Sequence, residues 1–160
     1  MNYIIGDIGN TSTRVCLLNE SKILHSIIFD TKKIFLKGFF KNTINRFIKK
    51  NLKNEILFSC VVPLALKEIK KNLKKTNYQV VEIKSFNLKK MIKINIKNFK
   101  QLGSDRIVNS IKGKEFKNCL IIDFGTATTF DIVKNETYEG GVIAPGIKSV
   151  SYTHLRAHET

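Results

Sequence analysis

The stretch Cys119 to Asp131, CLIIDFGTATTFD, is an apolar run that ends in an aspartate, a glycine and several threonines. Its apolar part, Leu120, Ile121 and Ile122, predicts a strand covered on both faces. Gly125 then allows a sharp turn where a Cβ would block a ligand. Asp123 supplies a carboxylate for a cation, and hydroxyl groups follow on Thr126, Thr128 and Thr129. The stretch therefore predicts a buried strand that leads into a tight phosphate-binding turn.

The same pattern occurs near the N-terminus in Tyr3 to Val15, YIIGDIGNTSTRV. The two stretches align at a constant offset of 116 residues, which matches Asp7, Gly9 and Thr13 to Asp123, Gly125 and Thr129. A chain of 160 residues is long enough for one domain and part of another. The repeat therefore indicates two domains built on one plan.

The chain carries a formal net charge of +15, with 28 Lys and Arg residues against 13 Asp and Glu. Only four of the basic residues are arginines, and the lysines are scattered among Ile and Asn throughout the sequence. Net charge speaks to solubility and nonspecific binding before it speaks to a specific site. We therefore expect a solvated lysine surface and no nucleic-acid partner.

No stretch reaches the roughly 18–20 uninterrupted apolar residues of a membrane span, and the first ten residues lack the features of a signal peptide. The sequence thus predicts a cytoplasmic protein with no membrane partner. Cys16, Cys60 and Cys119 form no C-x-x-C pair. Buried, reduced thiols are therefore favoured over metal ligands or disulfides.

Hydrophobic periodicity predicts an α/β chain in which an antiparallel three-stranded meander precedes alternating helices and strands. The expected strands of the first half are Asn2–Asp7, Ser12–Asn19, Ser21–Asp30, Ile56–Val62 and Tyr78–Ile83. The expected helices are Lys33–Asn51, which contains Gly38, a second helix that starts at Pro63, and Leu102–Phe116. Ser85–Lys100 has no clear period and predicts a loop or edge segment. The pattern restarts with a strand from Cys119, followed by strands at Phe130–Lys134 and Tyr138–Ile143.

We place the domain boundaries at residues 1–117 for the first domain and 118–150 for a second, incomplete one. The last ten residues, SYTHLRAHET, continue neither the apolar pattern nor the composition of the rest. They resemble read-through adaptor or vector sequence, so we interpret residues 151–160 as a non-native tail. His154 and His158 are accordingly not considered zinc ligands.

The chain lacks both the G-x-x-x-x-G-K-[ST] and the G-x-G-x-x-G pattern of common nucleotide-binding loops. Two facing Asp-x-Gly hairpins offer another way to hold a triphosphate, since turn N–H groups bind anions and carboxylates hold the accompanying cations. The alternative is that each aspartate only caps its own turn. Two such hairpins, each behind an apolar strand and followed by hydroxyl residues, favour the phosphate site.

Five motifs occur in one order: Asp7-Ile8-Gly9-Asn10-Thr11, Ser59-Cys60-Val61-Val62-Pro63, Gly103-Ser104-Asp105-Arg106, Asp123 to Thr129 and Gly140 to Gly146. Together they resemble the motifs of type III pantothenate kinase. The resemblance runs from Met1 to about Lys148. It implies a ribonuclease H-like, actin-like ATPase fold with two duplicated domains, and transfer of the ATP γ-phosphoryl group to pantothenate at the start of coenzyme A synthesis.

The resemblance also implies roles for individual residues. Asp105 would be the base that takes the hydroxyl proton, although the sequence alone equally allows Ser104 or Asp105 to cap a helix. Arg106 would position substrate and help balance phosphate charge, and Asp123 would hold K⁺ or NH₄⁺. Asp7 would lie near Mg²⁺. Pantothenate would contact Gly103, Ser104, Asp105 and Arg106, and ATP would contact Asp7, Ile8, Gly9, Asn10, Thr11, Ser12, Thr13, Arg14 and Thr126.

The chain departs from the family pattern upstream of Gly103, where Ile96 and Phe99 replace a usual Tyr and Pro and put one pantothenate contact in doubt. The resemblance implies a homodimer for a full-length parent, and it implies that a chain ending inside the second domain is an inactive fragment. Two alternatives stay open. One is a noncatalytic accessory or transcriptional regulator of the same family, and the other is an actin-like kinase for another small alcohol such as a sugar.

Overall fold

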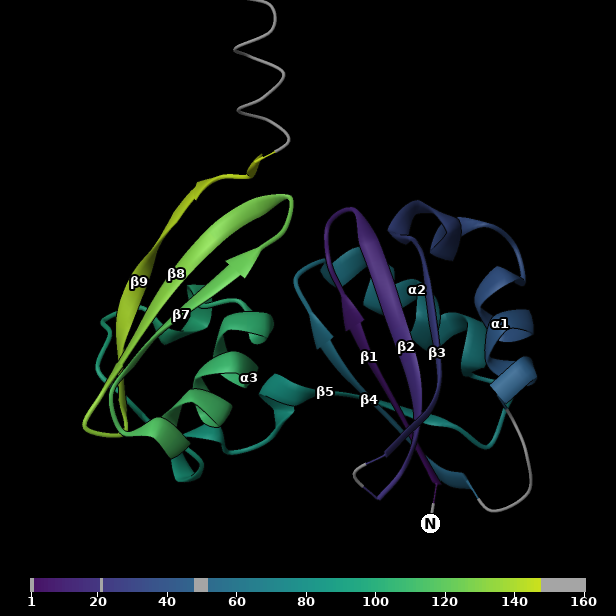
Figure 1. The fold of residues 1–160 in the computed structure, drawn as a ribbon. Coiled ribbons are helices and arrows are strands. Elements are labelled where there is room, and N and C mark those ends of the chain that lie inside the picture. The colour runs from purple at the N-terminus through teal and green to yellow at the C-terminus, as the bar shows by residue number, and fades with distance from the viewer. Residues whose placement is uncertain (1, 21, 48–51, 148–160) are drawn as a thin grey trace, which may run out of the picture. The chain divides into compact units, whose positions relative to one another are not determined.

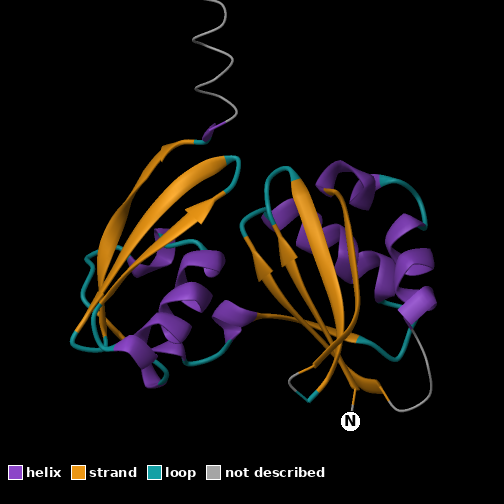
Figure 2. Ribbon diagram, viewed as in Figure 1, coloured by secondary structure: helices purple, strands orange, loops and turns teal. Residues whose placement is uncertain are grey.

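The computed structural model describes residues 2–20, 22–47 and 52–147, so the expected tail at 151–160 lies outside the described residues. The chain divides into two compact units, Met1–Phe86 and Asn87–Thr160. Each is an α/β unit with one sheet (Figure 1, Figure 2). Among the described residues, no helix is both long enough and apolar enough to cross a membrane.

The division between the units lies before the boundary expected at residues 117 and 118. Helix α3 (Ser104–Gly113) was expected in the first domain, but it packs against strands β7 (Cys119–Phe124) and β8 (Ala127–Lys134). Compactness therefore assigns α3 to the second unit. Compactness does not test the boundary that was placed from the sequence repeat, so that boundary stays a prediction.

The first unit contains a five-stranded sheet in the order β3-β2-β1-β4-β5. Strand β1 pairs antiparallel with β2 and parallel with β4, and β4 pairs parallel with β5. Strand β2 also pairs antiparallel with β3, so the expected antiparallel meander is confirmed. The strands are β1 (Asn2–Ile8), β2 (Ser12–Asn19), β3 (Lys22–Asp30), β4 (Leu52–Cys60) and β5 (Gln79–Glu82).

The helix expected from Lys33 is wrong in its extent. A 3₁₀ turn, η1 (Thr31–Phe35), is followed by helix α1 (Phe39–Phe47). Gly38 stands between them with φ +73°, a left-handed conformation that an α-helix does not continue through. The end of the expected helix, residues 48–51, lies outside the described residues. Helix α2 (Pro63–Leu73) begins at Pro63 as expected.

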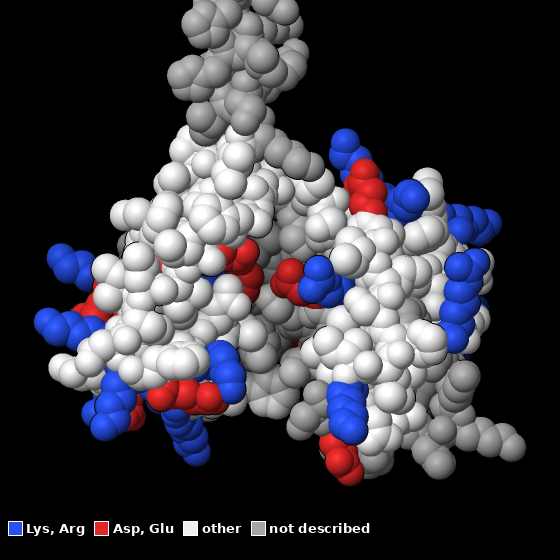
Figure 3. Space-filling model, in the orientation of Figure 1, with Lys and Arg blue, Asp and Glu red and all other residues white. Residues whose placement is uncertain are grey.

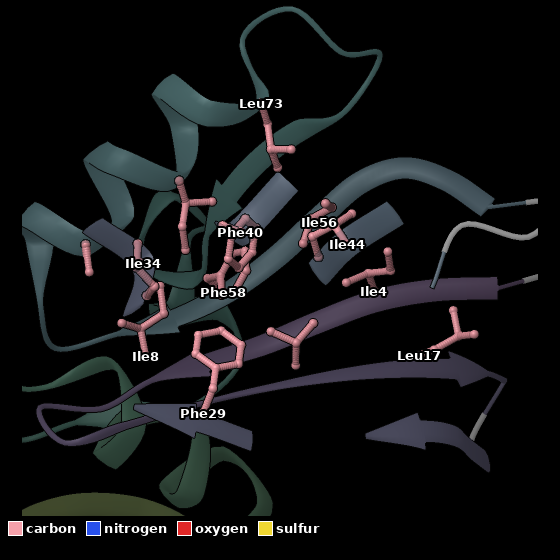
Figure 4. Close-up of a cluster of buried hydrophobic side chains, with 13 residues drawn as sticks. Ile4, Ile8, Leu17, Phe29, Ile34, Phe40, Ile44, Ile56, Phe58 and Leu73 are labelled. Atoms are coloured by element: carbon pink, nitrogen blue, oxygen red, sulfur yellow. The ribbon is translucent and has the colours of Figure 1, made fainter. Parts of the chain in front are cut away.

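One hydrophobic cluster lies between this sheet and helices α1 and α2 (Figure 4). Ile4 and Ile8 of β1 are 1% and 0% exposed, and they share the cluster with Phe58 of β4 and Phe40 of α1. The rings of Phe40 and Phe58 lie 6.0 Å apart between centroids. The helices therefore cover one face of the first sheet.

The second unit contains a four-stranded sheet in the order β6-β9-β8-β7, with α3 against it. The edge segment expected within Ser85–Lys100 is confirmed, because β6 (Lys93–Ile94) pairs parallel with β9 (Thr137–Pro145). Strands β7, β8 and β9 form a second antiparallel meander. Short 3₁₀ turns stand at Ile83–Ser85, Leu88–Lys90, Phe99–Gln101 and Lys114–Phe116.

The expectation that strand β7 is covered on both faces is wrong. Helix α3 approaches one face at Gly113, where an added Cβ would lie 2.7 Å from Cδ1 of Ile121. Leu120 and Phe124 point to the other face and are 57% and 66% exposed. Their counterparts in the repeat are Ile4 and Ile8, which α1 and α2 bury. The outer face of the second sheet comprises Leu120, Ile122, Phe124, Ile132 and Val142.

The three cysteines are free, as expected, although only Cys16 is fully buried and Cys60 and Cys119 are half-buried. Lys and Arg side chains on the visible face stand at separate places over both units and do not form one patch (Figure 3).

Candidate functional site

The first Asp-x-Gly hairpin joins β1 to β2, and a threonine at the start of η1 holds it in place. The Gly9 N–H donates to the Ser12 carbonyl (3.0 Å), and the Thr31 hydroxyl donates to the Gly9 carbonyl (2.7 Å). The Thr31 hydroxyl also lies 2.9 Å from that of Thr13, and the Thr31 N–H donates to the Thr11 carbonyl (2.9 Å). This set of hydrogen bonds fixes the loop from two sides.

These contacts separate the eight residues of this hairpin expected at ATP, residues 7–14, into two groups. The side chains of Ile8 and Thr13 are fully buried, and the Gly9 N–H is used within the turn, so these three groups already have contacts inside the unit. Asp7 and Arg14 lie opposite each other on β1 and β2 and are exposed. The remaining exposed side chains of the loop are Asn10, Thr11 and Ser12.

The second hairpin joins β7 to β8 and is one residue shorter. Phe124 pairs with Thr128, whereas its counterpart Ile8 pairs with Thr13. The expected match of Thr13 to Thr129 is therefore wrong in register, because the offset falls by one after the turn. Thr128 is the structural counterpart of Thr13, and both are buried.

Within the second hairpin, the Gly125 N–H donates to the Ala127 carbonyl (3.1 Å), and Thr126 is exposed at the tip. Gly146 lies against this turn, since an added Cβ would stand 2.6 Å from the Gly125 carbonyl oxygen. Asp123 is exposed and lines a groove of about 480 Å³ between α3 and β7. Asp123 and Thr126 are therefore both accessible.

The carboxylates fit the cations expected of them. The described residues contain no group of three or more His, Cys, Asp or Glu side chains that could hold a metal by themselves. Mg²⁺ in nucleotide sites is usually bound by one or two carboxylates together with phosphates and water. Asp7, an exposed carboxylate beside the first hairpin, suits that arrangement, and Asp123, an exposed carboxylate beside the second, offers oxygen ligands to a monovalent cation. When bound, such cations would offset phosphate charge.

The third group of expected site residues stands at the start of α3. Gly103 is the N-cap, in place of the Ser104 or Asp105 cap that the sequence allows, and no side chain caps the helix. Ser104 is buried, and Asp105 is half-buried with its Oδ1 accepting from the Arg106 N–H (2.8 Å). Of the four residues expected at pantothenate, Asp105 and Arg106 carry the ionisable groups.

Arg106 reaches from α3 to a buried aspartate on β8. Its Nε donates to Oδ1 of Asp131 (2.8 Å), and its Nη2 lies 2.7 Å from the same oxygen without the alignment of a hydrogen bond. The Tyr138 hydroxyl also donates to this oxygen (2.7 Å). Burial alone would lower the pKa of Arg106, but the hydrogen bond and charge of Asp131 outweigh it and raise that pKa. Burial and the hydrogen bond to Asp131 also raise the pKa of Tyr138.

Sequence reasoning missed Asp131 and Tyr138. Asp131 ends the stretch that decides the fold, and its position two residues from both Thr129 and Val133 places it on the inward face of a strand. Charged residues are rarely buried without a partner. The usable signal was therefore a single charge within the apolar run Phe130 to Val133, which required a cation from elsewhere in the chain.

The two departures upstream of α3 lie in the same unit. Ile96 is half-buried, and its Cγ2 would stand 3.4 Å from a Cβ added to Gly140. Phe99 is also half-buried and starts a 3₁₀ turn. Ile96 therefore lies beside Gly140, the residue that precedes Gly141 on β9.

Comparisons with known proteins agree with this fold and these motifs. Residues 3–158 match the family model for type III pantothenate kinase. The type III pantothenate kinase of Pelagibacter ubique (strain HTCC1062) is 46% identical over 149 residues, which cover 91% of this chain and 59% of the relative. This chain thus spans about three fifths of that relative's length.

Two solved structures share the fold. A Campylobacter jejuni protein assigned to the Baf family of transcriptional activators has a TM-score of 0.56 at 23% identity, covering 98% of this chain and 60% of its own. A Sinorhizobium meliloti protein assigned as a 2-dehydro-3-deoxygalactonokinase has a TM-score of 0.54 at 12% identity, covering 88% and 52%. These likenesses confirm the actin-like α/β fold. The family match spans nearly the whole chain, and the Pelagibacter relative is identical to it at almost half of the aligned positions. The chain therefore belongs to the type III pantothenate kinase family.

Proposed function

We propose that the protein to which this sequence belongs transfers the γ-phosphoryl group of ATP to the primary hydroxyl of pantothenate. The observation that carries the proposal is the family match over residues 3–158. Two Asp-x-Gly hairpins, each following the first strand of a β-meander, support it. Phosphoryl transfer depends mainly on alignment and charge neutralisation, which such hairpins and their cations can supply.

In this proposal, Asp7, Asn10, Thr11, Ser12 and Arg14 contact the ATP phosphates through accessible groups. Ile8, Gly9 and Thr13 shape the loop from within. Thr126 contacts ATP from the second hairpin, Mg²⁺ binds near Asp7, and a monovalent cation, K⁺ or NH₄⁺, binds at Asp123. The proposal also includes a cytoplasmic location and a homodimeric full-length protein.

Asp105 is the proposed base. Its carboxylate is half-buried at the start of α3, and an aspartate placed there can orient the acceptor hydroxyl and receive its proton as the phosphoryl group arrives. Gly103, Ser104 and Arg106 complete the proposed pantothenate contacts.

The test is pantothenate-dependent ADP release with ATP, Mg²⁺ and K⁺. It is run on the 160-residue chain and on the same chain extended by the C-terminal part of the Pelagibacter ubique relative. We expect turnover in the extended protein and little in the shorter one. Asp105→Asn should lower kcat by roughly 10²–10⁴-fold, the usual contribution of an acid or base group, without loss of fold.

Glu115→Gln is the matched control, because Glu115 is an exposed carboxylate just after α3 that pairs with Lys112 (2.6 Å). Its turnover should stay within about twofold, since an exposed ion pair adds little. Near-parental turnover in Asp105→Asn would show that Asp105 is not the base. Turnover with a sugar in place of pantothenate, or salt-sensitive DNA binding without turnover, would support one of the two alternatives.

A further inference from the structure

Arg106, Asp131 and Tyr138 form a buried polar cluster that ties the start of α3 to strands β8 and β9. Asp131 is 0% exposed, and the Arg106 side chain is 13% exposed. Oδ1 of Asp131 receives Nε of Arg106 and the hydroxyl of Tyr138, at 2.8 and 2.7 Å. Two donors on one oxygen hold the carboxylate in a single orientation.

The sheet leaves room for this cluster only because Gly141 has no side chain. Gly141 pairs with Asp131 across β8 and β9. An added Cβ would collide with the Phe130 carbonyl and stand 2.7 Å from Nη2 of Arg106. The guanidinium therefore passes directly over the glycine, and its position is determined by both the sheet and the carboxylate.

Stability is a poor explanation for such a cluster. Burying an ion pair costs desolvation that its attraction often only repays, and apolar side chains of similar size are often as stabilising. Here Oδ2 of Asp131 is also buried without a hydrogen-bond partner among the described residues, which adds to that cost. A cluster that costs this much is better explained by the orientation that it gives to Arg106.

That orientation extends to the proposed base. Asp105 precedes Arg106 in the first turn of α3, and its carboxylate accepts from the Arg106 N–H (2.8 Å). Fixing the Arg106 side chain on Asp131 thus also limits movement of the turn that carries Asp105. Because one carboxylate faces one guanidinium, the pair has no net charge. Arg106 would then bind an anionic group through directed N–H donors more than through net positive charge.

We propose that Asp131, supported by Tyr138 and by the space at Gly141, is a positioning residue for the acceptor site. It fixes Arg106 and the first turn of α3 toward a small acceptor that carries a carboxylate and a primary hydroxyl. This inference rests on the proposed pantothenate kinase function and adds to it residues that act through Arg106.

The test compares Asp131→Asn and Tyr138→Phe with Val133→Ala in the extended protein. Val133 lies on the same strand, 1% exposed and opposite Tyr138, but it makes no polar contact, so its truncation destabilises the unit without removing a hydrogen bond of the cluster. We expect Asp131→Asn to lower kcat/KM for pantothenate by about 10–100-fold, as losing a hydrogen-bonded support of a site residue does. Tyr138→Phe should have a smaller effect in the same direction. The KM for ATP should change little in either, and Val133→Ala should change neither KM.

A double substitution separates positioning from stability. If Asp131 acts through Arg106, Asp131→Asn should cost almost no further kcat/KM in an Arg106→Ala background. In the 160-residue chain, the Arg106 Nε–H resonance should be protected from exchange, shift on addition of pantothenate and lose protection in Asp131→Asn. Independent, additive losses in the double variant would overturn the inference. So would a pantothenate KM that rises as much in Val133→Ala as in Asp131→Asn. Absence of turnover in the unsubstituted extended protein would instead refute the proposed function, and this inference with it.

Discussion

Tyr138 is a buried phenol whose hydroxyl donates to the carboxylate of Asp131. Burial and that hydrogen bond raise its pKa above the ordinary value of 10, so the folded unit keeps the proton when the unfolded chain begins to lose it. The unfolded chain then binds fewer protons, and stability falls as pH rises. The stability that this proton contributes is complete below about pH 10 and is lost progressively as the pH rises above that value.

We therefore expect the second unit to lose more stability between pH 9 and pH 11 in the parent than in Tyr138→Phe. Urea midpoints measured at both values, with exchange of β8 amides as the probe, test this. Lysines titrate in the same pH range in both proteins, so the test is the difference between the stability lost by the parent and the stability lost by Tyr138→Phe. An equal loss in both would mean that the phenol ionises in the folded unit as readily as in the unfolded chain.

Candidate site residues could be selected from the sequence where the residue type limits the chemistry, and their roles stay predictions. Asp7, Asp105 and Asp123 stood out from the sequence because each precedes or follows a glycine turn or helix start. The cluster of Asp131 and Tyr138 was not predictable, because its partner Arg106 lies 25 residues away on another element. Nothing local in the strand indicates which distant cation fills that position.

At the scale of elements, the first hairpin depends on a residue outside it. Thr31→Val would remove the hydroxyl that donates to the Gly9 carbonyl and contacts Thr13, leaving buried polar groups without partners. We expect a loss of roughly 1–3 kcal/mol in stability and a raised KM for ATP in the extended protein, since the loop loses its support. Thermal or urea unfolding and ATP titration measure the two effects.

Thr76→Val is the control for this prediction. The Thr76 hydroxyl donates to the Leu73 carbonyl (2.6 Å) at the end of α2, so the same chemical change is made away from the hairpin. Stability should fall while the KM for ATP stays unchanged. If Thr31→Val and Thr76→Val leave ATP binding equally intact, the hairpin does not need its contact with η1.

Most elements were predicted from hydrophobic period, and their errors have local causes. Gly38 looked like a weak point inside one long helix, but its positive φ ends the helical path there. The two hairpins share one sequence pattern at a constant offset, yet a difference of one residue in the turn shifts the pairing of all residues that follow. Pattern alone could not reveal that shift, because both registers preserve the alternation of buried and exposed side chains up to the turn.

At the scale of the whole molecule, the two units differ in how much core they have. Among the described residues, fourteen buried apolar side chains lie in the first unit and six in the second. The outer face of the second sheet exposes five large apolar side chains, although the matching positions of the first sheet are covered by helices. Sequence alone predicted a covered β7, because an apolar strand does not show whether its cover is present in the same chain.

We therefore expect the units to unfold in separate steps, the second at lower urea, because stability depends on the apolar area removed from water. Hydrogen exchange followed by mass spectrometry should show amides of β8 opening before those of β1. A single step in which both strands lose protection together would mean that the units stabilise each other.

The central place of β1 in its sheet also affects how the chain is made. The meander β1-β2-β3 is complete at Asp30, but the other edge of β1 stays open until β4 ends at Cys60. At the usual pace of synthesis, those 30 residues take about 2–6 s. During that interval a nascent chain presents an apolar strand edge to the ribosome and to its neighbours, so slow translation of this segment would favour mispairing between chains.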